Sequence, residues 1–161
     1  METQFNFESI RNKIKESERE ALVLLSNQAQ NYFSESFKTQ SFDGQPWEEV
    51  KRRIPGTPEY KYPKTKGLQR RTQPILIGAG NKKRGGTLRR AVSSMAKTAE
   101  ISTSGGGGIS KLRMIVDLDY AKVHNEGEGH NPKRQFIGQT QQLTRMQHDK
   151  VEQIFNKVWK K

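Results

Sequence analysis

The sequence predicts an α+β fold that combines a long N-terminal helix, a small antiparallel β-sheet with a glycine-tipped hairpin, a C-terminal helix and a long basic loop. Three observations lead to this prediction. Apolar residues recur at steps of three and four over residues 7–38, strand-forming segments flank four consecutive glycines, and prolines and glycines are concentrated in residues 51–90. The 161 residues, of which only 31% are apolar, fit one domain with a modest core, 1–161, carrying an irregular basic insertion at about 51–86.

The N-terminal helix is expected over residues 7–38, because neither glycine nor proline interrupts the chain between Met1 and Phe42. At about 1.5 Å per residue this helix would span roughly 45–50 Å, which is long for so small a domain. We therefore expect it to pack partly on its own domain and partly on a neighbouring subunit. Two shorter helices with a bend near Ser26–Asn27 are the alternative.

A turn over residues 41–47 is expected to end this helix. Its Asp-Gly pair is typical of turns, and the proline that follows forces the preceding residue into an extended conformation. We expect Trp47 to anchor the turn on the core and residues 48–53 to add a short helical turn.

The net charge of +12 is localised in one segment. Residues 51–90 hold 13 of the 29 Lys and Arg residues and a single acid, Glu59, so that the rest of the chain is neutral. A basic extended loop attracts phosphate groups or an acidic protein surface, although a merely solvated insertion is the alternative. The candidate contact residues are Lys51, Arg52, Arg53, Arg70, Arg71, Lys82, Lys83, Arg84, Arg89 and Arg90.

A short helix and a β-hairpin are expected after the basic segment. Thr87 is a candidate N-cap for a helix over residues 88–95. Residues 99–104 and 112–118 have strand propensity, and Gly105–Gly108 between them is typical of a hairpin tip. No Lys-Ser or Lys-Thr pair follows these glycines, which argues against a phosphate-binding loop.

The C-terminal part predicts two further helices. Residues 119–127 look like a single helical turn that ends at Gly127. After a loop, a longer helix is expected from about Thr140 to Lys160, with lysines at its C-terminus where the helix dipole favours positive charge.

Several classes of protein and site are disfavoured by the sequence. It has no apolar run near 18 residues, no secretory signal pattern and no cysteine, so we expect no transmembrane helix, no export signal, no disulfide framework and no thiol chemistry. His124, Glu126, Glu128 and His130 form an H-x-E-x-E-x-H string, but in a glycine-containing loop we expect no metal site and no cofactor. Asp117 and Asp119 leave a metal-dependent nuclease open as an enzymatic alternative.

Four segments give the chain a family likeness. They are Phe42-Asp-Gly-Gln-Pro-Trp47, Gly86-Thr-Leu-Arg-Arg-Ala-Val92, Tyr120-Ala-Lys-Val-His-Asn-Glu-Gly127 and Pro132-Lys-Arg-Gln-Phe-Ile-Gly138. In this order they resemble the phage virion morphogenesis family, the tail completion proteins of Mu-like and P2-like tailed phages. The chain departs from the family pattern in the order of Gly86 and Thr87 and at Lys133 and Gln135, and residues 54–85 match nothing in it.

The resemblance implies a structural assembly protein and not an enzyme. Such a protein, like the related tail terminators, would complete the tail at its head-proximal end in the neck of the virion and support head–tail joining, binding passing DNA only weakly. It would form a ring, usually a hexamer, in contact with the tail tube and the head connector, and would assemble in the bacterial cytoplasm. A nucleic-acid-binding module is the non-enzymatic alternative. The family-like structural residues are Trp47, Leu88, Tyr120, His124, Gly127, Pro132, Arg134, Phe136 and Gly138.

Overall fold

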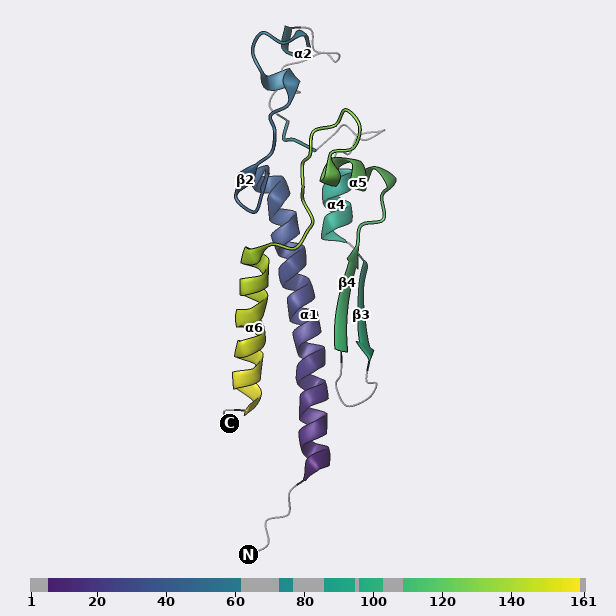
Figure 1. Ribbon diagram of the computed structural model, residues 1–161, viewed down its shortest axis with the longest axis vertical. Helices are drawn as coiled ribbons and strands as arrows, with labels where there is room; N and C mark the ends of the chain where they lie inside the picture. The colour runs from purple at the N-terminus through teal and green to yellow at the C-terminus, as the bar shows by residue number, and fades with distance from the viewer. Residues whose placement is uncertain (1–5, 62–72, 77–85, 95, 103–108, 160–161) are drawn as a thin grey trace, which may run out of the picture. The chain divides into compact units, whose positions relative to one another are not determined.

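The computed structural model describes residues 6–61, 73–76, 86–94, 96–102 and 109–159, and it has an α+β fold. Figure 1 shows the elements along the chain. They are α1 (Phe7–Thr39), β1 (Ser41–Phe42), β2 (Gln45–Pro46), the 3₁₀ turn η1 (Lys51–Arg53), α2 (Pro58–Lys61), α4 (Thr87–Ser93), β3 (Ala96–Ser102), β4 (Ile109–Ile115), α5 (Asp119–Glu126) and α6 (Gln141–Trp159).

The long N-terminal helix is confirmed as one continuous element, α1, and the alternative of two helices is wrong. Ser26 and Asn27, where a bend was the alternative, both lie within the helix. The Ser26 hydroxyl donates to the Val23 carbonyl within the preceding turn at 2.8 Å, which satisfies the buried side chain inside the helix.

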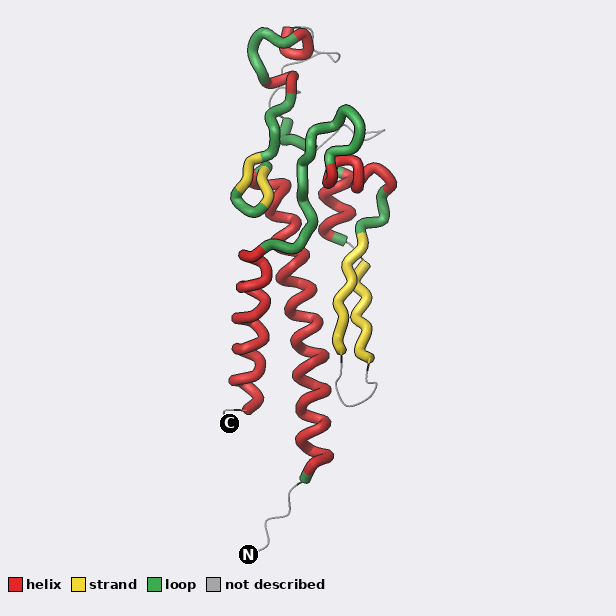
Figure 2. The backbone as a smooth tube through the Cα atoms, in the orientation of Figure 1, coloured by secondary structure: helices red, strands yellow, loops and turns green. Residues whose placement is uncertain are grey.

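Two antiparallel ribbons make up the β-structure of the described residues (Figure 2). β1 and β2 form a minimal hairpin around the predicted turn, in which Asp43 and Gly44 both have positive φ. β3 and β4 pair over seven residues in the register that runs from Ala96–Ile115 to Ser102–Ile109. The predicted glycine tip, residues 105–108, lies outside the described residues.

The boundaries of two predicted elements need correction. The strands lie about three residues earlier than the segments 99–104 and 112–118, because β4 ends at Ile115 and residues 116–118 lead into α5. Thr87 is not the N-cap of α4. That role belongs to Gly86, which has a left-handed φ of 85°, and Thr87 is the first residue of the helix.

The chain divides into two compact units, and α1 contributes to both. Unit 1 comprises residues 1–29, 96–115 and 139–161, and unit 2 comprises residues 30–95 and 116–138. The sequence predicted a single domain, and its pattern does not mark this division, since the boundary falls inside an uninterrupted helix.

Unit 1 pairs the first part of α1 with α6, which runs antiparallel beside it (Figure 1). Gln28 donates from Nε2 to the Met146 carbonyl at 3.2 Å, and Lys157 forms an ion pair with Glu20 at 2.9 Å. The buried apolar side chains of α1 and α6 in unit 1 are Leu22, Ala29, Leu143 and Ile154. At the start of α6 the Thr140 hydroxyl accepts the Leu143 N–H at 3.0 Å, which is an N-cap contact.

Unit 2 contains most of the buried core. Aromatic side chains dominate it, and Phe37 and Phe136 are each only 1% exposed. The other buried apolar members are Phe33, Phe42, Trp47, Ile75, Leu88, Val92 and Ala121. These come from the end of α1, the β1–β2 turn, α4, α5 and the 73–76 segment, so the four family-like segments all contribute to one core or to its edge.

Candidate functional site

The site that the sequence singled out most strongly is the landmark cluster, which we define as the packed set formed by the β1–β2 turn, α5 and residues 132–138 in unit 2. Its centre is aromatic. The rings of Phe37 and Trp47 lie 5.6 Å apart in an edge-to-face arrangement, and those of Phe37 and Phe136 lie 5.4 Å apart. Trp47 therefore does anchor the turn on the core, as predicted.

Hydrogen bonds join the turn to the segment after α5. The indole Nε1 of Trp47 donates to the Gln135 carbonyl at 2.7 Å. Arg134 donates from both Nε and an Nη to one acceptor, the main-chain carbonyl of Glu48, at 3.1 Å each. Both residues thereby bridge more than 80 residues of sequence, so they fix the turn and the segment against one another.

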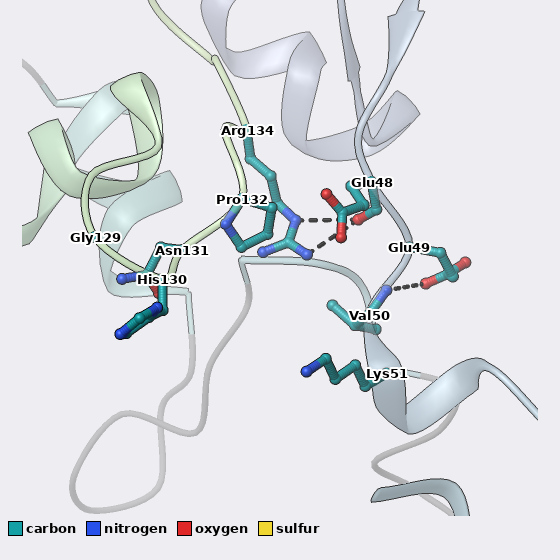
Figure 3. A pocket seen from close by; sticks show the side chains of 9 residues that line it. All are labelled: Glu48, Glu49, Val50, Lys51, Gly129, His130, Asn131, Pro132 and Arg134. Atoms are coloured by element: carbon teal, nitrogen blue, oxygen red, sulfur yellow. Dashed lines mark hydrogen bonds between the residues drawn. The ribbon is translucent and has the colours of Figure 1, made fainter. Parts of the chain in front are cut away.

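Arg134 is a buried arginine that serves the backbone. Only 8% of it is exposed, and burial lowers its pKa, while the Glu48 and Glu49 carboxylates raise it. A guanidinium is still charged under these conditions because its ordinary pKa lies far above neutrality. The charged side chain therefore binds the Glu48 carbonyl through two hydrogen bonds (Figure 3).

Asn125 ties α5 to the same segment. Its side-chain oxygen accepts the N–H groups of both Phe136 and Ile137, at 3.0 and 3.1 Å. The carbonyl of the preceding residue, His124, accepts the N–H of Arg134 at 2.8 Å. Asn125 was not among the predicted site residues, although it lies inside the family-like segment of residues 120–127. The available signal in the sequence was a polar residue shortly before a helix-ending Gly-x-Gly segment.

Gly127 closes α5 in the way that the sequence predicted. It is the C-cap with a left-handed φ of 79°, and its N–H donates to the Val123 carbonyl at 3.0 Å. A Cβ at this residue would lie 2.8 Å from the backbone nitrogen of Lys133 and 2.9 Å from its Cα. The glycine therefore allows the chain to return closely over the end of the helix.

His124 places a titratable ring in the cluster. Its Nδ1 is buried and has no hydrogen-bond partner among the described residues, and its ring meets Tyr120 edge-on at 6.0 Å. Burial, and then the charge of Arg134, lower the pKa of His124 below its ordinary value of 6.5. The ring is therefore neutral at neutral pH and acts as part of the packing.

The remaining predicted structural residues have mixed environments. Leu88 is buried in α4, and Pro132 and Gly138 are half-buried, whereas Tyr120 is 42% exposed. Among these, Tyr120 departs most from an interior role.

The predicted basic contact residues fall into three groups. Lys51, Arg89 and Arg90 are exposed. Arg52 and Arg53 are half-buried, and their guanidinium groups bind main-chain carbonyls of the 73–76 segment: Arg52 donates to Gln73 and Pro74, and Arg53 to Gln73 at 2.6 Å. The other five, Arg70, Arg71, Lys82, Lys83 and Arg84, lie outside the described residues.

Gln40 is a second residue that the sequence did not single out. It has a positive φ of 53°, and its backbone carbonyl accepts the Trp47 N–H at 2.8 Å. Its side-chain oxygen accepts the N–H of Ile75 at 3.0 Å and a guanidinium N–H of Arg53 at 3.3 Å. Gln40 thus connects the end of α1 to the turn and to the 73–76 segment.

A shallow cleft of about 460 Å³ adjoins the landmark cluster (Figure 3). Its lining mixes both signs of charge and consists of Glu48, Glu49, Val50, Lys51, Gly129, His130, Asn131, Pro132 and Arg134. Figure 3 shows Arg134 turned toward Glu48 on one wall, with His130 and Asn131 on the other. The most buried cation of the cleft, Arg134, already binds the Glu48 carbonyl. The lining therefore offers few polar groups that converge on a single point, as they do in a site for one small molecule.

The residues considered for metal or nuclease chemistry are exposed or have other partners. Within the described residues no group of three or more His, Asp or Glu side chains is placed to hold a metal ion. Asp117 and Asp119 are both exposed, Glu128 forms an ion pair with Lys122 at 2.6 Å, and Glu126 accepts a hydrogen bond from Asn125. The described helices also include none with the length and apolar character of a membrane span.

Comparisons of the chain with protein-family models, with curated proteins and with solved structures each found no match.

Proposed function

We propose that this protein is a structural virion assembly protein that completes the tail of a phage at its head-proximal end and supports head–tail joining. It acts as a ring of copies, with six as the expected number, in contact with the tail tube and the head connector. It has no catalytic activity. It is assembled in the bacterial cytoplasm and remains in the neck of the virion.

The observation that supports this proposal is the structural role of the family-like residues in unit 2. Trp47 and Arg134 bind main-chain carbonyls, Phe136 fills the core, and Gly127 permits a close chain crossing. The residues on which the resemblance rests are therefore occupied in holding one compact unit together. This is the pattern expected where a family shares a structural role, because catalytic residues are held ready for a substrate.

The experiment is the removal of the protein from the phage that encodes it, by a nonsense mutation early in its gene, followed by electron microscopy of the particles. We expect DNA-filled heads and tails that fail to join, with tails lacking a finished head-proximal end. Supplying the wild-type chain from a plasmid restores joined particles. Normal infectious particles made without the protein would contradict the proposal.

A nucleic-acid-binding module is the second candidate function, favoured by the exposed cations Lys51, Arg89 and Arg90 in unit 2. A phosphate-binding surface needs such solvent-facing cations, and binding through them falls steeply with salt. The two candidates differ in the phage experiment, since only the structural role requires the protein in the finished particle.

A further inference from the structure

Unit 1 exposes an apolar stripe along α6. Val151, Phe155 and Trp159 are spaced by four residues, so they lie on one side of the helix, and they are 45%, 59% and 38% exposed. The rings of Phe155 and Trp159 lie 5.8 Å apart and form one surface. Lys157, which pairs with Glu20 of α1, comes two residues after Phe155 and therefore lies on nearly the opposite side of α6.

A second apolar surface lies on the first turns of α1. Lys157 of α6 meets Glu20, and α6 ends at Trp159, only two residues later. α1 continues in the other direction from Glu20 to Phe7, roughly 20 Å of helix at about 1.5 Å per residue. Figure 1 shows these turns of α1 extending past the C-terminal end of α6.

The face of α1 that meets α6 continues into these turns, where it carries two isoleucines. Ile10 and Ile14 lie on the same side of the helix as Gln28, which binds Met146 of α6. Ile14 is 51% exposed. We call the turns that carry Ile10 and Ile14 the α1 extension.

The charges beside the two surfaces are complementary. In the α1 extension the exposed Arg11 and Lys15 flank Ile14 at three residues before it and one after it. In α6 the exposed Glu152 has the same two spacings, three before Phe155 and one after Val151, with the exposed Asp149 beside it. The basic pair of α1 and the acidic pair of α6 therefore lie on equivalent flanks of their apolar stripes. The two pairs carry opposite charge.

Antiparallel packing brings these charges together. Two antiparallel helices are related by an approximate two-fold axis across their contact, so equivalent sides of the two helices face each other. Arg11 and Lys15 of one helix would then lie opposite Glu152 and Asp149 of the other. Within one chain α6 turns Met146 and Lys157 toward α1, and Phe155 lies on nearly the opposite side of α6 from Lys157, so its stripe does not face its own α1.

We propose that the α6 stripe of one copy packs antiparallel on the α1 extension of a second copy of this chain. Each copy uses two different surfaces, so the contact is heterologous and can be repeated from copy to copy until it closes. The inference deepens the proposed function and rests on it for the closure into a ring, whereas the contact itself follows from the two surfaces and their charges.

The experiment measures the assembly state of the full-length chain by native mass spectrometry and sedimentation. Phe155→Glu alters the α6 stripe and Ile14→Glu alters the α1 extension, and both residues are exposed, so circular dichroism should show unchanged helicity. We expect each variant to weaken self-association by at least about tenfold. Val23→Glu is the matched control, because Val23 is 59% exposed and lies on the opposite side of α1 from Ile14.

Mixing identifies the heterologous contact. Phe155→Glu chains keep an intact α1 extension and Ile14→Glu chains keep an intact α6 stripe, so a mixture should form one-to-one pairs that neither variant forms alone. The charges give a second readout: Lys15→Glu and Glu152→Lys should each weaken assembly, and the chain with both changes should recover it.

The alternative outcomes separate the two proposals. Assembly that is insensitive to Ile14 and Phe155, or equally sensitive to Val23, overturns this contact and leaves the tail function standing. A wild-type chain that is monomeric at its highest soluble concentration overturns the contact as well. Normal particles in the absence of the protein overturn the tail function, whatever the mass spectrometry shows.

Discussion

Single polar side chains hold the landmark cluster together at the residue scale, and Asn125 is the clearest case. Its one oxygen satisfies two main-chain N–H groups, those of Phe136 and Ile137. A partly buried donor without its acceptor costs about 1–3 kcal/mol. The sequence marks Asn125 only by its place just before the helix-ending Gly127, and its two acceptor contacts depend on where the chain returns after the loop.

We predict that Asn125→Ala lowers the free energy of unfolding by about 1–3 kcal/mol, because both N–H groups lose their acceptor. Denaturant unfolding followed by tryptophan fluorescence measures the change, since Trp47 lies in the same cluster. Asn131→Ala is the control: Asn131 is exposed and its side chain donates a long 3.4 Å hydrogen bond, so a change within about 0.5 kcal/mol is expected. Equal effects of the two substitutions would contradict the role of Asn125.

His124 predicts a pH dependence of stability. Its pKa is lowered in the folded chain, so the unfolded chain binds more protons as pH falls through about 6.5. The contribution of neutral His124 is therefore fully present above 6.5 and declines as pH falls toward the folded pKa. We expect the unfolding midpoint to drop over this window and the drop to shrink in His124→Gln.

The matched control for the pH experiment is His148→Gln. His148 is exposed on α6, outside unit 2, and its removal should leave the shape of the pH profile as in the wild-type chain. A profile that is flattened by His148→Gln and not by His124→Gln would refute the assignment.

At the scale of elements, the sequence predicted those that depend on local pattern. α1 follows from a long stretch without glycine or proline, and α5 ends at Gly127 as expected. The predicted strands lay about three residues too late in the sequence, because Val116 and Leu118 extend the apolar run beyond the true end of β4. Their limits are set by cross-strand pairing with β3, which the pattern within either strand does not encode.

The end of α5 allows a sharp comparison of two glycines. Gly127 and Gly129 both have positive φ, of 79° and 66°, so an alanine at either residue costs roughly 1–2 kcal/mol. Gly127 lies against the Lys133 backbone, while the space around Gly129 is open. We predict that Gly127→Ala destabilises the protein by about 1–3 kcal/mol more than Gly129→Ala in thermal or denaturant unfolding. Indistinguishable losses would show that the crossing is not tight.

At the scale of the whole molecule, the charge is divided between structure and surface. Arg52 and Arg53, which the sequence grouped with the contact residues, hold the 73–76 segment through its carbonyls. Composition locates charge but does not reveal whether a guanidinium faces solvent or a neighbouring carbonyl. Lys51, Arg89 and Arg90 are the exposed described members of the same group.

We predict weak duplex DNA binding without sequence preference that decreases steeply with salt. The triple substitution of Lys51, Arg89 and Arg90 by Ala should reduce the slope of log affinity against log salt, by up to roughly 0.9 for each phosphate that the variant no longer neutralises. Fluorescence anisotropy over a salt series measures it. A chain with Lys13, Arg19 and Arg145 replaced by Ala, which are exposed cations of unit 1, is the control of equal charge, and an identical slope change in both chains would contradict a specific surface.

The interlocking of the landmark cluster has a consequence for chain cleavage. The exposed loop with Gly129 and His130 separates α5 from the segment that Trp47 and Asn125 hold. A protease that cuts this loop would leave two polypeptides whose ends are bound independently of the severed bond. Such a nicked protein would run as two bands on a denaturing gel and elute as a single species from a sizing column, so backbone continuity at this loop and integrity of the cluster are separable properties.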